Sequence, residues 1–281
     1  MRFNSDITYG VPPEPMTIAC AKFFSEHALL HAYVTFIIDL VGHVDHARFV
    51  ANEALLEYAR SKEEKEKYIA YSKSYGSAAR QYFMYNEVAH EMWLCRCVDN
   101  YLCYISDLLA LIFTSKPETL RSNETVTTEE LLRHSRIEDV IQALAEKKVN
   151  QLSYKGLPEL FKHLQDKLGF QLFQNEEEMY YARNAVELRN LIVHNRGIVN
   201  NVFLHRVPDY SGVIGDRIRL SDENLISIVA LISRSVSDID VRASSKFGLP
   251  QSCQTKDELM EKYVCCDCKF KGKEYHDIKN N

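Results

Sequence analysis

The chain gathers positive charge in one short stretch, although it is acidic as a whole. Its formal net charge is −5 at pH 7. Residues 181–206, in contrast, hold four arginines and a single acid: Arg183, Arg189, Arg196 and Arg206 against Glu187. Affinity for a phosphate backbone comes chiefly from Lys and Arg, so an acidic chain needs a local site of this kind to hold RNA. This stretch is where we expect chemistry on a phosphodiester.

Arg189 and His194 are the two residues in the stretch that are best suited to such chemistry. The Arg189 guanidinium is a rigid, always-charged fork that can stabilise charge on phosphate oxygens. His194 falls in the expected last turn of a helix, where the negative end of the helix dipole favours the imidazolium and helps proton exchange near neutral pH. Together they suit RNA cleavage by the 2′-hydroxyl, which needs proton transfer and charge stabilisation. Asn190 could orient either partner.

Helical geometry sets a condition on this pair. At about 100° per residue, Glu187, Asn190 and His194 share one side of the helix. Arg189 and His194 are then roughly 140° apart around the axis. A joint site therefore requires the long arginine side chain to swing round, or a second helix to complete it, and a dimer would supply that helix.

Two long helices are predicted to position the site. The first begins after Asn175, which can cap a helix and is followed by three glutamates at the positive end of its dipole, and it ends near Arg196. Gly197 is placed to stop it. The second covers 84–112, where apolar residues recur at spacings of three and four, and it ends at Lys116-Pro117.

The rest of the chain is also predicted to be helical. Only 10 Gly and 7 Pro are spread over the sequence, and good helix formers fill long stretches. We therefore expect an all-α fold with at most a short β-piece near residues 217–220. The other expected helices run from Thr17 through a buried apolar stretch at 28–42, and over 45–60, 137–152, 158–168 and 221–246.

Several features predict a cytoplasmic protein without membrane contact. Residues 1–15 lack the basic start and apolar run of a secretory signal. The apolar stretch 28–42 is interrupted by His31 and Asp39 and is shorter than the ~20 residues of a bilayer span. Eight cysteines in such a chain are expected to stay reduced.

Two groups of residues could bind metal, but neither has a complete ligand set. The tail offers one Cys-x-x-Cys knuckle without a second to pair it, and the N-terminal histidines lack matching carboxylates on an open face. We therefore expect no metal and no cofactor; zinc binding by the tail remains an alternative. The residues concerned are Cys253, Cys265, Cys266, Cys268 and His276 in the tail, and His27, His31, His43 and His46 near the start.

The hexapeptide RNLIVH, residues 189–194, resembles the Arg-polar-x-x-x-His signature of the HEPN ribonucleases. Its context is similar as well. The run CVDNYLCYISDLLALIFTSKPETL, residues 97–120, resembles the second core helix of a prokaryotic HEPN branch, and GDRIRL with the final helix resembles the end of that branch. The resemblance spans roughly 87–247. It suggests a HEPN bundle at 86–247, an N-terminal helical extension at 1–85 packed on it, and a Cys/Lys-rich tail at 248–281.

The resemblance implies a function and roles for named residues. HEPN ribonucleases are four- to five-helix bundles that dimerise with two motifs facing one cleft, and many are toxins or antiviral effectors that cut RNA without metal. By this resemblance Arg189 and His194 are catalytic, with Asn190, Asp99 and Glu187 supporting them and Arg196, Asn195 and Arg183 contacting substrate. Asp99 either orients Arg189 or is an ordinary helix residue. The expected partners are RNA, a second copy or higher homo-oligomer, and an antitoxin or regulatory protein.

A second interpretation uses the same residues without catalysis. An arginine and a histidine on an amphipathic helix often make only salt bridges and caps, and short motifs match by chance. In this interpretation the bundle is a dimerisation or adaptor module. Metal-independent RNA cleavage distinguishes the two hypotheses.

Overall fold

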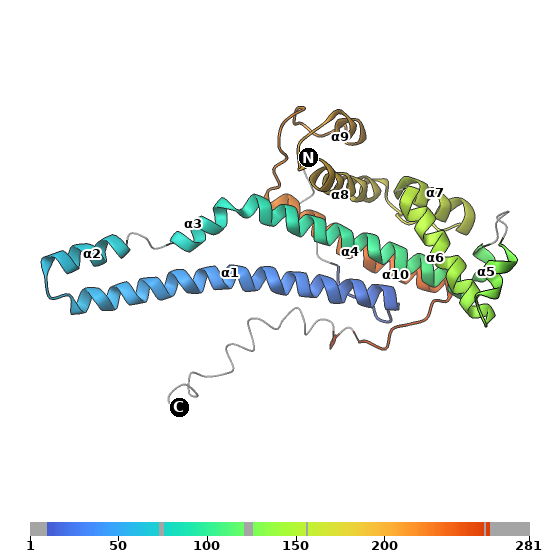
Figure 1. Cartoon of the computed structure of the whole chain (residues 1–281), viewed down its shortest axis with the longest axis horizontal. Coiled ribbons are helices and arrows are strands. Elements are labelled where there is room, and N and C mark those ends of the chain that lie inside the picture. Colours follow the sequence, from blue (N-terminus) through green and yellow to red (C-terminus); the bar gives the residue numbers. More distant parts are fainter. Residues whose placement is uncertain (1–9, 73–75, 121–125, 156, 256, 259–281) are drawn as a thin grey trace, which may run out of the picture.

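The computed structural model describes residues 10–72, 76–120, 126–155, 157–255 and 257–258. Its elements are helices (Figure 1), so the prediction of an all-α chain is confirmed. The predicted β-piece is one antiparallel bridge between Arg217 and Ile198. The helices are α1 (Ile18–Tyr58), α2 (Lys62–Ser72), α3 (Ser77–Met84), α4 (Asn86–Ser115), the 3₁₀ helix η1 (Pro117–Leu120), α5 (Thr128–Leu132), α6 (Ile137–Lys155), α7 (Leu157–Leu168), α8 (Glu176–Asn195), α9 (Asn201–Arg206) and α10 (Asp222–Phe247).

Helix α4 is the centre of the core and contacts α1, α6, α8 and α10. Its apolar residues recur at spacings of three and four, and the inward-facing ones are buried from Leu94 through Tyr101 to Ile112. Phe23 and Phe24, near the start of α1, meet edge to face at 5.2 Å in the same core. The predicted extension at 1–85 therefore shares its core with the predicted bundle at 86–247.

A buried carboxylate joins the start of α1 to α10. Asp240 accepts hydrogen bonds from the Thr17 backbone N–H at 2.9 Å and from the Thr17 hydroxyl at 2.5 Å. Burial raises the pKa of Asp240, and the hydrogen bonds from Thr17 oppose that shift. After α10, Leu249 is buried and the Ser252 N–H donates to the Met16 carbonyl at 2.8 Å. The first residues of the predicted tail thus pack on the core.

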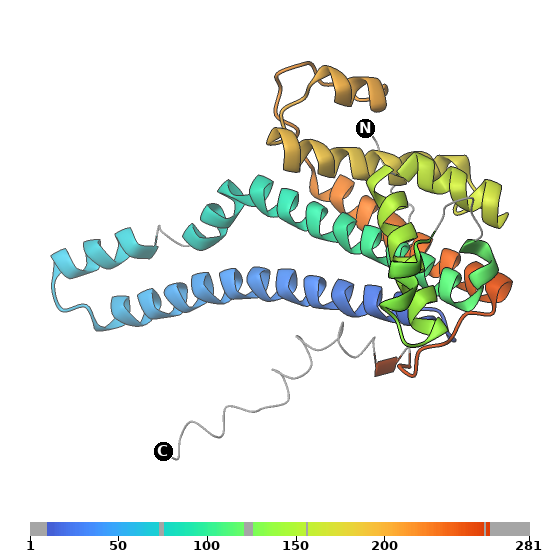
Figure 2. The same cartoon turned by 45° about the vertical axis from the view of Figure 1, so that its right-hand side comes forward.

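Helix α1 corrects two predictions. The expected helices at the N-terminus form one continuous helix of 41 residues. The apolar stretch 28–42 was predicted to be buried, and this is wrong: Ala28 is its buried residue, while Leu29 is 58% and Tyr33 60% exposed. Beyond the core, the second half of α1 extends outward and forms one side of an arm. Helices α2 and α3 turn back along α1 and form the other side (Figures 1 and 2). Periodicity predicts an apolar face, but it does not say whether anything covers that face.

The inner side of this arm is hollowed. A groove of about 780 Å³ lies between α1, α3 and α4, lined mainly by apolar side chains that include Tyr33, Ile37, Phe83 and Trp93. The open side of the groove explains why so many large apolar residues of the arm stay accessible to solvent.

Two described helices are long and apolar enough to cross a membrane. They are α1, whose most apolar window is 11% buried, and α4, whose window is 50% buried. Length and composition alone do not separate a membrane span from the core helix of a water-exposed bundle. The predicted cytoplasmic location stays a prediction.

Candidate functional site

Helix α8 carries most of the predicted site, and both of its ends form as the sequence predicts. At the start, the Asn175 side chain accepts a hydrogen bond from the Glu177 N–H at 2.8 Å. At the end, Arg196 and Gly197 are left-handed, with φ of 55° and 72°. The Gly197 N–H returns to the Leu191 carbonyl at 3.0 Å, which closes the last turn. The chain therefore leaves α8 directly after the motif.

Arg189 is fixed by a residue from another helix. Its guanidinium makes an ion pair with Asp99 of α4 at 2.8 Å and donates to the Asn190 side-chain oxygen at 3.2 Å. The Arg189 side chain is 23% exposed, and its Nε is buried without a hydrogen-bond partner among the described residues. A buried donor left unsatisfied is uncommon in native proteins and calls for an explanation. Asp99 and Asn190 thus orient Arg189, and part of its hydrogen-bonding capacity remains unused.

The Asp99 contact belongs to a row of ion pairs along α4. Glu91 pairs with Arg217 at 2.8 Å, and Glu87 lies 3.6 Å from Arg219. Positions 87, 91, 95 and 99 are four residues apart, so they form one face of α4. Cys95 occupies the remaining position, and its thiol pKa is raised by burial and by the Asp99 charge, with Arg189 acting in the opposite sense.

The same contacts give the direction of α8. Arg189 lies beside Asp99, and Gly197 lies beside Glu91, whose Oε1 would be 3.4 Å from a Cβ at that glycine. Helices α8 and α4 are therefore antiparallel, and the last turn of α8 runs along the face of α4 that carries Cys95.

His194 is exposed in the last turn of α8. Within the described residues it makes no hydrogen bond or ion pair. Five helical positions separate it from Arg189, about 7.5 Å along the axis and about 140° around it. A single α8 therefore does not bring the guanidinium and the imidazole onto one face. The exposed Val193 beside His194 leaves this end of the helix open to a second molecule.

The other predicted residues differ in what they contact. Glu187 pairs with Arg206 of α9 at 3.0 Å, so it supports the helix after the motif and not Arg189 itself. The Asn195 amide donates to the Ile198 carbonyl and holds the turn. Arg183 and Arg196 are exposed. Of the predicted supporting residues, Asn190 and Asp99 contact Arg189.

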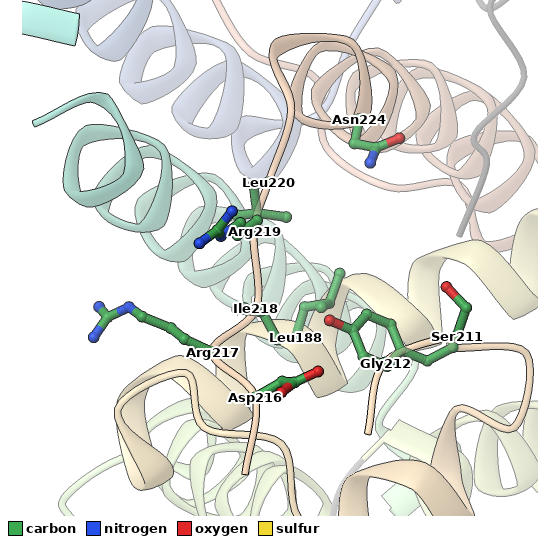
Figure 3. Close-up of a pocket in the computed structure, with 10 residues that line it drawn as sticks. Leu188, Ser211, Gly212, Asp216, Arg217, Ile218, Arg219, Leu220 and Asn224 are labelled. Atoms are coloured by element: carbon green, nitrogen blue, oxygen red, sulfur yellow. The ribbon is translucent and has the colours of Figure 1, made fainter. Parts of the chain in front are cut away.

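The sequence interpretation missed a pocket beside the end of α8. It has a volume of about 530 Å³ and is lined by residues of the 210–220 segment, by Leu188 of α8 and by Asn224 of α10 (Figure 3). The sequence marks this segment only by Pro208, Gly212 and Gly215, which indicate turns. Nothing in the linear pattern shows that the turns fold back onto α8.

Metal ligands do not cluster in the part of the chain that the structure describes. No three His, Cys, Asp or Glu side chains there are placed to hold an ion. His27 is buried against Phe23, with ring centroids 5.5 Å apart, which is a core position. The Cys-x-x-Cys knuckle of Cys265 and Cys268, with His276, lies outside the described residues.

Comparisons with known proteins add no family to these observations. No family model, no curated protein and no solved structure matches the chain.

Proposed function

We propose that this chain is a metal-independent RNA endonuclease of the HEPN type that works as a dimer. The observation that supports the proposal best is the arrangement around Arg189. Asp99 and Asn190 hold its guanidinium on α8, while His194 is exposed five residues later on the same helix. An oriented cation and a free imidazole are the groups that 2′-hydroxyl cleavage needs.

The proposed reaction is a transesterification. The ribose 2′-oxygen attacks the adjacent phosphorus, the bond from phosphorus to the 5′-oxygen breaks, and a 2′,3′-cyclic phosphate and a 5′-hydroxyl result. One proton leaves the 2′-hydroxyl and one reaches the 5′-oxygen, and His194 is the group assigned to proton transfer. Arg189 stabilises the charge on the non-bridging oxygens.

A dimer completes this site. Within one chain the two groups face different sides of α8, whereas a second copy can bring its His194 to the Arg189 of the first. In keeping with the family resemblance, the biological role that we propose is that of a toxin or antiviral effector, restrained by an antitoxin or another regulatory protein.

The decisive experiment is an RNA cleavage assay in EDTA. Wild type should release products with 2′,3′-cyclic phosphate ends, and Arg189→Ala and His194→Ala should each lower the rate by at least about 100-fold. Matched controls are Arg133→Ala, since Arg133 also pairs with a carboxylate, Glu129, and His46→Ala, an exposed histidine on α1. Wild type without activity in EDTA, or full activity in both site variants, contradicts the proposal.

A non-catalytic adaptor is the second candidate, and one observation favours it. The Asp99 contact neutralises Arg189 in the single chain, as a structural salt bridge does. This candidate predicts dimers with no RNA cleavage, and a loss of thermal stability in Arg189→Ala that accounts for every effect of the substitution.

A further inference from the structure

The pocket beside α8 is a half-open cleft that is lined by both polar and apolar side chains. Leu188 and Leu220 provide apolar surface, and Asp216, Ser211 and Asn224 provide polar groups. Its volume of about 530 Å³ lies in the range of small-molecule sites. Figure 3 shows Asp216 and Ser211 on opposite walls, with Asn224 above them.

The pocket wall is attached to the end of the motif helix. The Ile218 N–H donates to the Gly197 carbonyl and the Val199 N–H to the Asp216 carbonyl, each at 2.8 Å, and the Gly215 N–H donates to the Val199 carbonyl at 2.9 Å. Gly197 is three residues beyond His194. The pocket wall is therefore hydrogen-bonded to the turn that directly follows α8.

Asp216 is the carboxylate among the residues that line the pocket. Arg217 and Arg219 contribute to the lining, but their side chains turn away from Asp216 toward Glu91 and Glu87 of α4 (Figure 3). Asp216 accepts one long hydrogen bond, from the Val213 N–H at 3.4 Å, so most of its acceptor capacity is open.

Tyr210 adds an aromatic wall. Its ring packs against Phe203 at 5.2 Å, and burial followed by the Asp216 charge raises the pKa of its hydroxyl. The tyrosine is therefore neutral and can donate a hydrogen bond. The side chains of Ser211 and Asn224 make no hydrogen bond within the described residues, which leaves both available to a ligand.

We propose that this pocket binds one unpaired guanine base of the RNA that the chain cleaves, a proposal that rests on the function proposed above. Proteins read single-stranded RNA by stacking bases on aromatic rings and by hydrogen bonds to their Watson–Crick edges. Guanine alone among the four bases presents two adjacent donors there, the N1–H and the 2-amino group. These donors match the two oxygens of the Asp216 carboxylate.

Binding of mononucleotides tests the pocket without any cleavage. Titration calorimetry of the full chain with GMP, IMP and UMP should give the tightest binding for GMP. IMP, which lacks the 2-amino group, and UMP should be weaker by about tenfold or more, because a hydrogen bond to a charged group contributes about 1.5 kcal/mol or more. Asp216→Asn should remove the preference, and Glu223→Gln, an exposed neighbour outside the lining, should keep it.

Asn224→Ala is a second variant that leaves the Asp216 turn intact, and it should weaken GMP binding with little change in thermal stability. Equal affinity for the three nucleotides, no binding of any, or an unchanged preference in Asp216→Asn overturns the pocket assignment. A GMP preference in a chain that cuts no RNA supports the pocket and contradicts the proposed function. RNA cleavage with no preference for guanine supports the proposed function and contradicts the pocket assignment.

Discussion

At the scale of single residues, His27 links the folding of the chain to pH. It is 4% exposed near the start of α1, and burial, followed by the charge of His31, lowers its pKa from 6.5 to about 4. The unfolded chain protonates this histidine below pH 6.5, and the folded chain only below about pH 4. The stability that the neutral ring contributes is therefore complete above pH 6.5 and is lost as the pH falls toward 4.

We predict that, on the acid side of neutral pH, the free energy of unfolding depends less on pH in His27→Leu than in wild type. Between about pH 7 and about pH 4, the wild-type free energy of unfolding should fall by about 3 kcal/mol more than that of the variant. Asp240 is present in both proteins, so its own titration cancels in the difference. Urea unfolding at several pH values measures the effect, with His46→Leu as the exposed control. Parallel pH profiles for wild type and His27→Leu would show that burial does not suppress protonation.

Single residues of the candidate site also differ in how far the sequence alone predicts their roles. Arg189 and His194 can be selected from the type of their side chains and their spacing, and both keep the places on α8 that this spacing gives them. Asp99, the partner of Arg189, is 90 positions away in the sequence. Only the packing of α4 on α8 shows whether Asp99 orients Arg189 or is an ordinary helix residue. Glu187 was placed on the correct helix, but its partner is Arg206, because α9 folds back after the left-handed turn at Arg196.

Among the elements, the arm made of α1, α2 and α3 depends on a capping contact. Asp45 is buried on the outer half of α1 and accepts hydrogen bonds from the Ala78 and Ala79 N–H groups at 3.0 and 2.9 Å. These donors belong to the first turn of α3, where backbone N–H groups lack helical partners. The hydrogen bond from Ala79 is the main reason that the pKa of Asp45 is lowered.

We expect Asp45→Ala to release α3 from α1 while the core stays folded. Amide hydrogen exchange over 77–84 should become several-fold faster, and exchange in the central turns of α4 should not change, because local opening and global unfolding are separate processes. Asp39→Ala, an exposed position on the same helix, is the control. Uniform acceleration over the whole chain would mean that the arm and the core unfold together.

The elements were predictable where local chemistry decides them. Asn175, Ser221 and the Lys116-Pro117 pair gave correct helix ends, since capping and the missing proline N–H act within one turn. The continuity of α1 and the exposure of its apolar side were not predictable. They depend on α2 and α3, which turn back along the arm and leave one side of the groove open.

For the whole molecule, the decisive question is whether one copy or two build the proposed catalytic centre. The separation of about 140° between Arg189 and His194 on α8 favours a centre shared between copies. The exposed His194 and Val193, and the accessible apolar side chains at the junction of α3 and α4, such as Met84 and Met92, lie on helices that a second molecule can reach.

We predict that two inactive variants restore activity when they are mixed. Arg189→Ala keeps His194 and His194→Ala keeps Arg189, so a mixed dimer has one complete centre if each centre takes one residue from each copy. Random exchange makes half of the dimers mixed, each with one of two centres intact, so activity should recover to about a quarter of the wild-type rate per chain. Cleavage in EDTA after joint refolding of the variants measures this recovery, and each variant refolded alone is the control. Mixed dimers that form, as shown by mass, and yet stay inactive would place Arg189 and His194 of the same chain in one centre.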